Sequence, residues 1–328
     1  MHAVDRSMVG RTGCVTAPAA SPPGPAFRFE AVSHAYGAHV ALDRLTLEVP
    51  RGETVALLGP NGAGKSTSIS LLLGLQHAGD GTVEVLSTTP RRAVSQGRVG
   101  AMLQTGAGTG LPPGIRVSAL VRLVRRLYRH AAPFADTVER AGIGPLLDRQ
   151  THQLSGGQVQ RVRFAIAIAG DPELVFLDEP TAAMDVEGRR AFWDMIRQFG
   201  HEGRTVVLAT HHLQEADQIA DRVVVVNHGR VVANGPGATL KAAVAARRLR
   251  FLCARPDEAL LNSLEGVTDV LAQGACVTVD SLDADATVRA LVQRGVDFRE
   301  LEVTGPDLED AFLTLTRHAR ASATRQAL

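Results

Sequence analysis

Alternating apolar and polar residues near the start of the chain predict β structure. Residues 27–36 and 41–50 alternate in this way. The apolar run that follows at residues 55–58 is typical of a strand buried on both faces of a parallel sheet. Residues 67–75 then place apolar side chains at helical spacing, and residues 78–104 indicate short strands and turns.

Apolar runs alternate with helical patterns in the middle of the chain, which predicts an α/β fold with a mainly parallel sheet. The strands expected at 173–180 and 204–212 are apolar enough to be buried on both faces. The remaining expected elements are helices at 135–150, 159–169 and 191–200, and a pair of strands at 221–235 around an Asn-His-Gly turn.

Residues 106–114 are rich in glycine and proline and are expected to form a mobile loop before a basic helix. The apolar face of that helix comprises Val117, Leu120, Val121, Val124 and Tyr128, and the opposite face carries Arg122, Arg125, Arg126 and Arg129. Two interpretations of the arginines remain open. One is a solvated face of a surface helix, which we favour, and the other is a docking face near anionic lipid or a membrane partner.

The pattern changes after Gly235-Pro236. Residues 240–250 indicate a short basic helix or linker. The residues after it predict the element order βαββαβ of a ferredoxin-like unit, followed by a helix at 307–316. This part of the sequence contains no cluster of candidate catalytic residues, so we interpret it as a small binding or regulatory appendage.

Composition narrows the class of protein. The chain has 328 residues, 45% of them apolar, so one large or two smaller domains can each bury a core. Its net charge of +1 gives no general attraction to nucleic acid. The three cysteines, Cys14, Cys253 and Cys276, are too scattered for a disulfide framework or a zinc site, which favours a reducing compartment. We expect neither a membrane-spanning helix, which needs roughly 20 apolar residues, nor a signal peptide.

The clearest chemical signal is the stretch GPNGAGKST, residues 59–67. Of the 35 lysines and arginines, only Lys65 and Lys241 are lysines. A compact ammonium fits a tight loop around phosphate, where a planar guanidinium is too wide. The pattern G-x-x-x-x-G-K-[ST] is typical of a phosphate-binding loop, whose lysine reaches the β- and γ-phosphates and whose next hydroxyl ligates Mg²⁺. The expected strand before it and helix after it supply the context that this loop requires.

A second anion site and a pair of carboxylates follow. LSGGQ, residues 154–158, leads into a helix, so backbone N–H groups and a hydroxyl meet at a helix N-terminus. One nucleotide does not need two such sites on one chain. The second site is therefore expected to serve a second chain, arranged head to tail so that each chain completes the other's site. Asp178 and Glu179 end an apolar strand, where carboxylates are costly unless they bind something. Asp178 suits Mg²⁺, and Glu179 suits polarising an attacking water.

Residues 27 to about 240 resemble the nucleotide-binding subunit of an ATP-binding cassette (ABC) transporter, with the motifs of that family in order and at its spacing. The matching positions are Walker A at 59–67, the Q-loop glutamine Gln104, the signature at 154–158, Walker B at 174–179, the D-loop at 183–185, the switch histidine His211 after Thr210, and Tyr36 as the aromatic that stacks on adenine. In this pattern His212 is a neighbour without a chemical role.

The resemblance implies ATP and Mg²⁺ as cofactors and ATP hydrolysis as the reaction. It assigns the chemistry to Glu179, His211 and Lys65. It assigns the metal to Ser66, Gln104 and Asp178. The implied nucleotide contacts are Tyr36, Gly59, Asn61, Gly62, Gly64, Lys65, Ser66, Thr67, Gln104 and Asp178 on one chain, and Ser155, Gly157 and Gln158 on the other. ATP then holds a homodimer together, and hydrolysis opens it.

Residues 102–123 and 304–316 look like those of ATPases of ABC-2-type exporters, many of which serve drug or antibiotic efflux. The implied function is to power export of a small molecule. The implied partners are an ABC-2-type membrane permease and a second ATPase subunit, with no nucleic acid. The implied location is cytoplasmic, peripheral on the inner face of the cell membrane.

Two alternatives remain open. One is an importer ATPase, for which the C-terminal unit supplies a regulatory domain. The other is a non-transport ABC ATPase that acts on ribosomes or DNA. Such proteins usually carry two cassettes, a long coiled coil or zinc fingers, and the sequence contains none of these signals.

The expected fold class is α/β. It is a P-loop NTPase cassette with a RecA-like core, an N-terminal antiparallel β subdomain and an α-helical signature subdomain, plus a small α+β ferredoxin-like domain. The expected segments are a disordered tail at 1–25, the ATPase domain at 26–240, the C-terminal unit at 241–320 and a short tail at 321–328.

Overall fold

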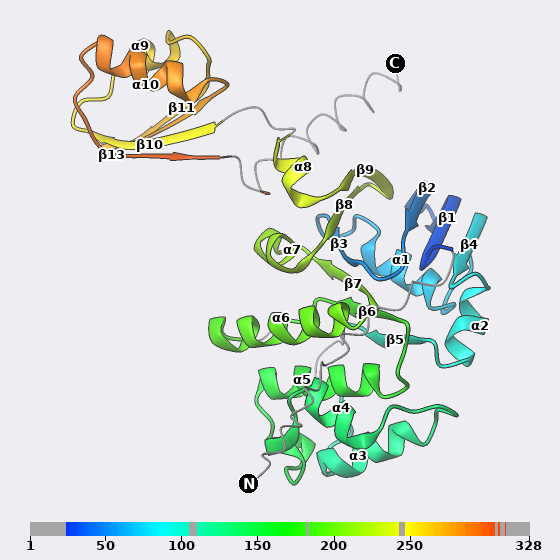
Figure 1. Ribbon diagram of the computed structural model, residues 1–328. Coiled ribbons are helices and arrows are strands. Elements are labelled where there is room, and N and C mark those ends of the chain that lie inside the picture. Colours follow the sequence, from blue (N-terminus) through cyan, green and yellow to red (C-terminus); the bar gives the residue numbers. More distant parts are fainter. Residues whose placement is uncertain are drawn as a thin grey trace, which may run out of the picture.

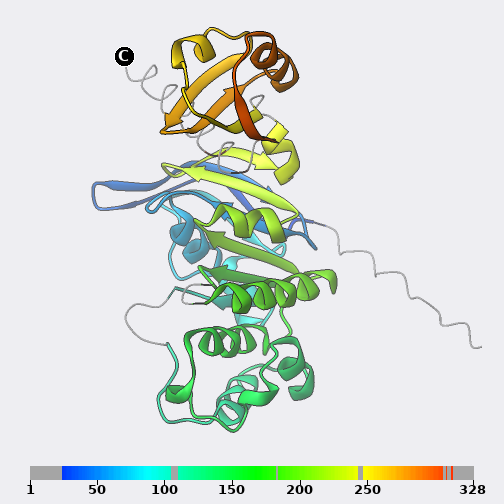
Figure 2. The same ribbon diagram turned by 90° about the vertical axis from the view of Figure 1, so that its left-hand side faces the viewer.

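The structure is a computed structural model that describes residues 24–104, 110–181, 184–242 and 247–305, together with Leu308 and Phe312. In these residues the strands form three sheets, of three, six and four strands. Helices lie beside each of them (Figures 1 and 2). Nearly all of the predicted N-terminal tail, and residues 106–109 of the predicted loop at 106–114, lie outside the described residues.

The three-stranded sheet is antiparallel, as the alternating pattern predicts, and has the order β2-β1-β4. Its strands are β1 (Phe27–Tyr36), β2 (His39–Val49) and β4 (Asp80–Val85). One face of this sheet is apolar and buried. This face packs against the six-stranded sheet and against the helix that follows the phosphate loop.

The six-stranded sheet has the order β5-β6-β7-β3-β8-β9. Its strands are β3 (Thr54–Leu58), β5 (Val99–Met102), β6 (Leu174–Asp178), β7 (Thr205–Thr210), β8 (Arg222–Asn227) and β9 (Arg230–Gly235). The strands from β5 to β8 pair in parallel, and β9 returns antiparallel to β8 through the predicted turn. The carboxyl ends of β3, β6 and β7 consequently lie side by side.

Both faces of this sheet are buried. Along β6, Leu174 and Phe176 belong to the core shared with the three-stranded sheet, whereas Val175 and Leu177 belong to a second core beneath the helices. Alternate side chains of a strand lie on opposite faces, so an unbroken apolar run is the pattern that such a strand requires. The helices of this part are α1 (Lys65–Leu72), α2 (Pro90–Ser95), α3 (Val117–Arg125), α4 (Phe134–Arg140), α5 (Gly156–Ile168), α6 (Val186–His201), α7 (Leu213–Ile219) and α8 (Gly237–Ala242).

Two sequence expectations in this part are wrong. The segment 78–104 contains helix α2 in addition to strands and turns. Helix α2 begins at Pro90, because the fixed φ of proline suits the first helical position. The helix expected over 135–150 ends at Arg140, because Gly142 turns the chain with a φ of 58°. Two short 3₁₀ turns follow, at Gly144–Leu146 and Thr151–Gln153.

The basic helix is present as α3, and it is shorter than the sequence predicts. Val117, Leu120 and Val121 are buried, and three of the four arginines are exposed. Tyr128 lies beyond the end of the helix, where its ring packs beside the backbone of Gly170. An exposed arginine face is the feature that both interpretations of this helix require.

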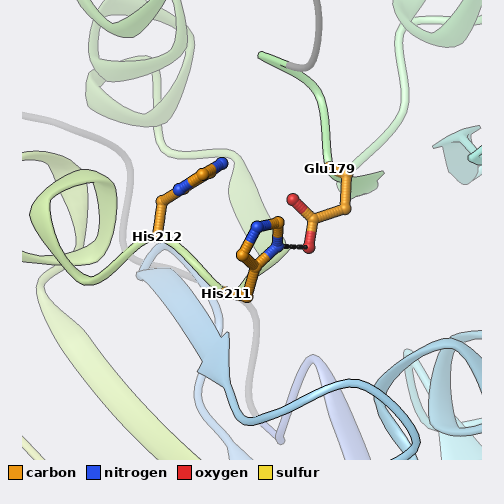
Figure 3. Close-up of side chains that lie close together, drawn as sticks. All are labelled: Glu179, His211 and His212. Atoms are coloured by element: carbon orange, nitrogen blue, oxygen red, sulfur yellow. Dashed lines mark hydrogen bonds and ion pairs between the residues drawn. The ribbon is translucent and has the colours of Figure 1, made fainter.

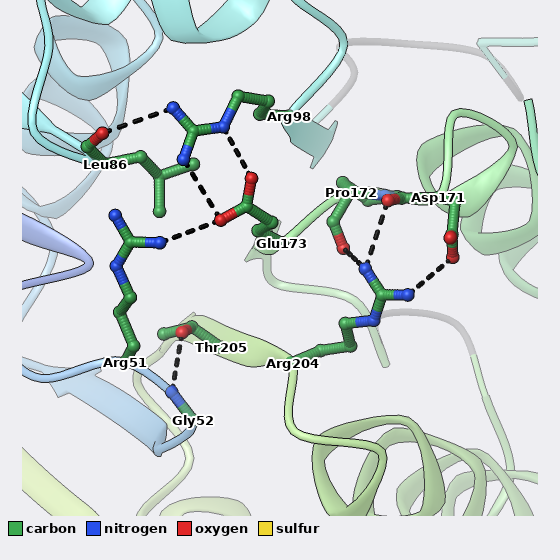
Figure 4. Close-up of polar contacts among 9 residues, drawn as sticks. All are labelled: Arg51, Gly52, Leu86, Arg98, Asp171, Pro172, Glu173, Arg204 and Thr205. Atoms are coloured by element: carbon green, nitrogen blue, oxygen red, sulfur yellow. Dashed lines mark hydrogen bonds and ion pairs between the residues drawn. The ribbon is translucent and has the colours of Figure 1, made fainter. Parts of the chain in front are cut away.

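A cluster of charges ties together the amino ends of three strands (Figure 4). Arg51 precedes β3, Arg98 precedes β5, and Glu173 precedes β6. The Nη1 of Arg51 donates to Oε2 of Glu173 at 2.8 Å, and Nη2 of Arg98 donates to the same oxygen at 3.1 Å. The hydrogen bond from Arg98 is the main reason why the pKa of Glu173 is lowered, and the positive charge of Arg51 lowers it further. The cluster therefore holds together the amino ends of these strands, on the side of the sheet opposite to their carboxyl ends.

The C-terminal part forms a four-stranded antiparallel sheet with its own core, in the predicted element order βαββαβ. Its elements are β10 (Arg247–Cys253), α9 (Glu258–Asn262), β11 (Val267–Gln273), β12 (Cys276–Ser281), α10 (Ala284–Gln293) and β13 (Phe298–Thr304). The strand order is β11-β12-β10-β13, and both helices cover one face. Apart from Leu308 and Phe312, the helix expected at 307–316 lies outside the described residues. Every helix in the described part of the chain is too short or too polar to cross a lipid bilayer.

Candidate active site

The loop between β3 and α1 is built by close backbone contacts. Gly64 is the N-cap of α1 and has a φ of 106°, a conformation that glycine adopts without strain. A Cβ on Gly64 would lie 2.7 Å from the carbonyl oxygen of Ala41, and one on Gly59 would lie 2.3 Å from that of Val226. Glycine at these positions therefore lets the loop lie against β2 and the end of β8.

The Lys65 side chain crosses back over this loop. It is only 7% exposed, and its Nζ donates to the carbonyl oxygens of Gly59 at 2.6 Å and Pro60 at 3.2 Å. Burial lowers the pKa of Lys65, and the nearby carboxylates of Glu179 and Asp178 oppose that shift. The ammonium is thus held in a protein environment that favours an anionic partner.

Two side-chain oxygens that could bind a metal ion meet at the end of β6. Ser66 Oγ donates to Asp178 Oδ2 at 3.1 Å, and the backbone N–H of Gln104 also hydrogen-bonds to Asp178. Burial is the largest influence on Asp178 and raises its pKa, while the bond from Ser66 lowers it. A hydroxyl beside a carboxylate is a set of hard oxygen donors of the kind that Mg²⁺ prefers, so these residues fit that ion.

Glu179 and His211 are brought together by the neighbouring strands β6 and β7. Nδ1 of His211 lies 2.7 Å from Oε1 of Glu179 (Figure 3). Glu179 has a φ of 48°, a region that non-glycine residues seldom occupy, and its N–H donates to the carbonyl oxygen of Ala209 at 2.9 Å. The chain turns at Glu179 in this way, directly after the strand, and its carboxylate meets the histidine. The ring of His212 lies beside that of His211, with 4.0 Å between the centroids.

These residues line one cavity of about 430 Å³. The predicted site residues on its wall are Tyr36, Asn61, Gly62, Gly64, Lys65, Ser66, Thr67, Gln104, Asp178, Glu179 and His211. Gly59 is not part of the wall, and its carbonyl oxygen accepts a hydrogen bond from Lys65 Nζ. Tyr36 is about half exposed, and its hydroxyl donates to Gln76 Oε1 at 2.7 Å. A half-exposed aromatic ring therefore lines the same cavity as the cation and the carboxylates.

Ser155, Gly157 and Gln158 do not line this cavity. They form the start of α5, where the Ser155 side chain accepts from the N–H of Gln158 at 3.4 Å and the Gln158 side chain accepts from the N–H of Ser155 at 3.1 Å. Ser155 is exposed, and the first turn of α5 contains no acidic side chain. The positive end of this helix is thus open to an anion from outside the chain.

A buried carboxylate, Glu215, supports the Glu179–His211 pair, and the sequence analysis missed it. Its side chain is 1% exposed and accepts hydrogen bonds from the hydroxyls of Thr181 and Thr210, the latter at 2.9 Å. Thr181 follows Glu179 by two residues, and Thr210 directly precedes His211. The N–H of His212 donates to Thr210 Oγ1 at 3.0 Å. Glu215 therefore connects the two segments that carry the pair.

Arg189 extends this network to the D-loop. Its Nη2 donates to the carbonyl oxygen of Met184 at 3.4 Å, and its Nε lies 4.0 Å from Oε1 of Glu215. The signal that could have identified Glu215 is an acidic residue in the first turn of a helix that begins beside a candidate catalytic histidine. The sequence analysis did not predict this helix, α7.

A strand, a glycine loop and a helix that carries a lysine and a hydroxyl, with two carboxylates at the end of another strand of the same sheet, define a P-loop nucleoside triphosphatase. Residues 42–182 match the family model described as ABC transporter. The chain is 33% identical over 305 residues to the daunorubicin/doxorubicin resistance ATP-binding protein DrrA of Streptomyces peucetius, covering 86% of this chain and 90% of that protein. It is also 33% identical over 292 residues to Nod factor export ATP-binding protein I of Sinorhizobium fredii, covering 87% and 84%.

Among solved structures, cbiO1 of Clostridium perfringens, described as part of the ABC transporter complex cbiONQ, matches with a TM-score of 0.60 and 26% identity, covering 66% of this chain and 91% of that one. The chain therefore belongs to the family of ABC transporter ATP-binding subunits. It binds and hydrolyses ATP as the subunit of a transporter, together with a membrane permease and in a dimeric assembly. The predicted family and fold class are confirmed.

Proposed function

We propose that this subunit powers export of a small molecule through a separate ABC-2-type permease, and that it hydrolyses ATP at the interface between two copies of the chain. The observation that carries the proposal is the separation of Ser155 and Gly157 from the cavity that contains Lys65. Two relatives named for drug resistance and for Nod factor export support the direction of transport. The transported molecule is chosen by the permease.

In this proposal the cavity of one copy holds the nucleotide. Tyr36 stacks on adenine, because a half-exposed aromatic ring in the wall of the cavity matches the flat base. The N–H groups of Gly62 and Gly64 and the ammonium of Lys65 surround the phosphates. Ser155, Gly157 and Gln158 of the other copy close the site, and the uncompensated N-terminus of α5 attracts the terminal phosphate.

The hydroxyl of Ser66 and the carboxylate of Asp178 would hold Mg²⁺, with Gln104 beside them. When bound there, the ion supplies positive charge against the phosphate oxygens. Glu179 orients and polarises the attacking water, and its short contact with His211 fixes the direction of the carboxylate. Lys65 and His211 stabilise the charge that develops on the transferred phosphoryl group. Positioning and charge are the main demands of phosphoryl transfer, and these residues supply both.

The domain limits remain as proposed from the sequence: a cassette at 26–240 and a C-terminal unit at 241–320, with tails at 1–25 and 321–328. The separate core of the four-stranded sheet supports that division. We further propose that the subunit sits on the cytoplasmic face of the cell membrane, held there by the permease.

Affinity purification of the tagged chain from detergent-solubilised membranes of its source cell tests the proposed function. We expect to recover a six-helix membrane protein. Vesicles that contain this protein together with the ATPase chain should show ATP-dependent efflux. Recovery of a solute-binding protein with the complex, or of ribosomes in place of a membrane protein, would contradict export.

A further inference from the structure

We propose that Glu179, His211 and His212 form a binding site for a Zn²⁺-like transition metal, and that the bound metal switches ATP hydrolysis off. Ligand atoms of the three side chains lie within 4.8 Å of one another (Figure 3). Two imidazoles and one carboxylate, with a fourth position left for water, are a donor set that zinc adopts in proteins. The site itself follows from this geometry, whereas its inhibitory effect rests on the role proposed above for Glu179.

Two neighbouring strands hold the three ligands together. Asp178 at the end of β6 pairs with Ala209 on β7, so Glu179 and His211 emerge side by side from adjacent strand ends. The Glu179 side chain is 12% exposed and that of His211 is 49% exposed, and His212 is exposed too. An ion can therefore reach ligands whose backbone positions are already fixed.

Only small movements are needed to complete the site. Two ligands on a tetrahedral zinc ion lie about 3.3 Å apart when the bonds are about 2.05 Å long. The 2.7 Å contact between His211 Nδ1 and Glu179 Oε1 therefore opens by about 0.6 Å. The exposed ring of His212 turns toward them, and such rotations of exposed side chains take nanoseconds or less.

The donor set separates this site from the magnesium position. Mg²⁺ prefers oxygen ligands in octahedral geometry, and imidazole nitrogens favour zinc or copper. Ser66 and Asp178 offer oxygen donors, whereas His211 and His212 offer nitrogen. Magnesium at millimolar concentration therefore leaves the two histidines available to a transition metal at far lower concentration.

A metal bound here removes two groups from the hydrolysis step. The carboxylate of Glu179 becomes a ligand and cannot orient a water, and the ring nitrogen of His211 is occupied. His212 takes no part in the proposed hydrolysis. Its loss should therefore weaken metal sensitivity and leave turnover in place.

The test uses the full-length chain without an affinity tag, at free Zn²⁺ concentrations set by a metal buffer. Competition with a chromophoric chelator, in the absence of ATP, measures binding, and phosphate release at saturating Mg·ATP measures activity. One Zn²⁺ per chain and at least a tenfold loss of activity at the zinc concentration that fills the site are expected, with recovery on chelation. His212→Asn should retain activity within about twofold and weaken zinc binding and inhibition at least tenfold, since a ligand is lost.

His201→Asn, at an exposed histidine at the end of α6, is the matched control and should behave as wild type. Equal zinc binding by wild type and His212→Asn would overturn the site. Normal zinc binding without inhibition would preserve the site and overturn its inhibitory effect. The chelator measurement is independent of turnover, so failure of the proposed function and failure of the metal site give different results.

Discussion

The carboxylate of Glu179 and the imidazole of His211 are 2.7 Å apart, although 32 residues separate them in the chain. Parallel pairing of β6 and β7 places the two residues at one edge of the sheet. The unusual backbone of Glu179 then turns its side chain toward the cavity that also contains Lys65 and Asp178. This pair is the structural centre of the proposed hydrolysis.

Replacing Glu179 with glutamine should stop turnover and leave ATP binding in place. The amide has nearly the shape of the carboxylate but cannot act as a general base, and loss of such a group typically costs about 10²-fold to 10⁴-fold in rate. Phosphate release should fall at least a hundredfold, while the Kd for ATP from equilibrium dialysis changes little. Glu187→Gln, at an exposed position in the first turn of α6, should keep its rate. Normal turnover in Glu179→Gln would reject Glu179 as the base.

Replacing Glu215 with glutamine should lower kcat while KM for ATP stays within about twofold. Glu215 lies outside the cavity wall and acts only by positioning Thr181 and Thr210, and so the Glu179–His211 pair. Small displacements of reacting groups carry large kinetic costs, so a decrease of about tenfold in kcat is expected. Asp217→Asn, on the same helix and in a surface pair with Lys241, is the control. A rise in KM with unchanged kcat would show that Glu215 serves nucleotide binding instead.

Replacing Gly64 with alanine should both destabilise the fold and weaken ATP binding. The new Cβ would meet Ala41 O and Leu42 Cδ2 at 2.7 Å, and φ of 106° is strained for any residue with a side chain. Strain of this kind costs about 1–3 kcal/mol, so urea unfolding should begin at lower concentration. At Gly235 a Cβ meets nothing within 4 Å, and Gly235→Ala should leave ATP affinity unchanged. Equal affinities for ATP in both variants would argue against the tight loop.

Replacing Glu173 with glutamine should reduce stability in a pH-dependent way. The bonds from Arg98 and Arg51 lower the pKa of Glu173, so its charge stabilises the folded state above the ordinary pKa of glutamate. That contribution is lost as the pH falls through the lowered pKa. Because Glu173 is 37% exposed, we expect a loss of only about 1 kcal/mol at pH 7.

The difference between wild type and Glu173→Gln should shrink as the pH falls from about 4.3, the ordinary glutamate value, toward the lowered one. Urea unfolding at several pH values measures it. Glu139→Gln, at an exposed residue that has no ion pair among the described residues, is the control. A difference that stays constant with pH would show that the charge of Glu173 is not the cause.

Motifs that depend on local chemistry could be predicted from the sequence. The run at 55–58 and the glycines around Lys65 have one physical explanation each, a buried strand and a tight anion loop. The structure places both accordingly. The order βαββαβ of the C-terminal unit likewise followed from period and turn residues alone.

Features that depend on distant contacts could not be predicted. The positive φ of Glu179 is held by a bond to Ala209 on another strand. The importance of Glu215 is visible only once β6 and β7 bring Thr181 and Thr210 to its carboxylate. Helix α2 was missed because six residues are too few to establish a period, which leaves Pro90 as the main local signal.

The mass of the Glu179→Gln chain in solution, measured by light scattering with and without excess Mg·ATP, tests the shared site most directly. The account predicts the mass of two chains with ATP and of one chain without it. If the chain alone stays monomeric, the measurement is repeated with the permease present, and ATP is again expected to bring two chains together. Adding Ser155→Arg should prevent the association while a single chain still binds ATP, because Lys65 and Ser155 act on different copies. A strictly monomeric chain under all these conditions, or loss of ATP binding by the Ser155→Arg monomer, would contradict the account.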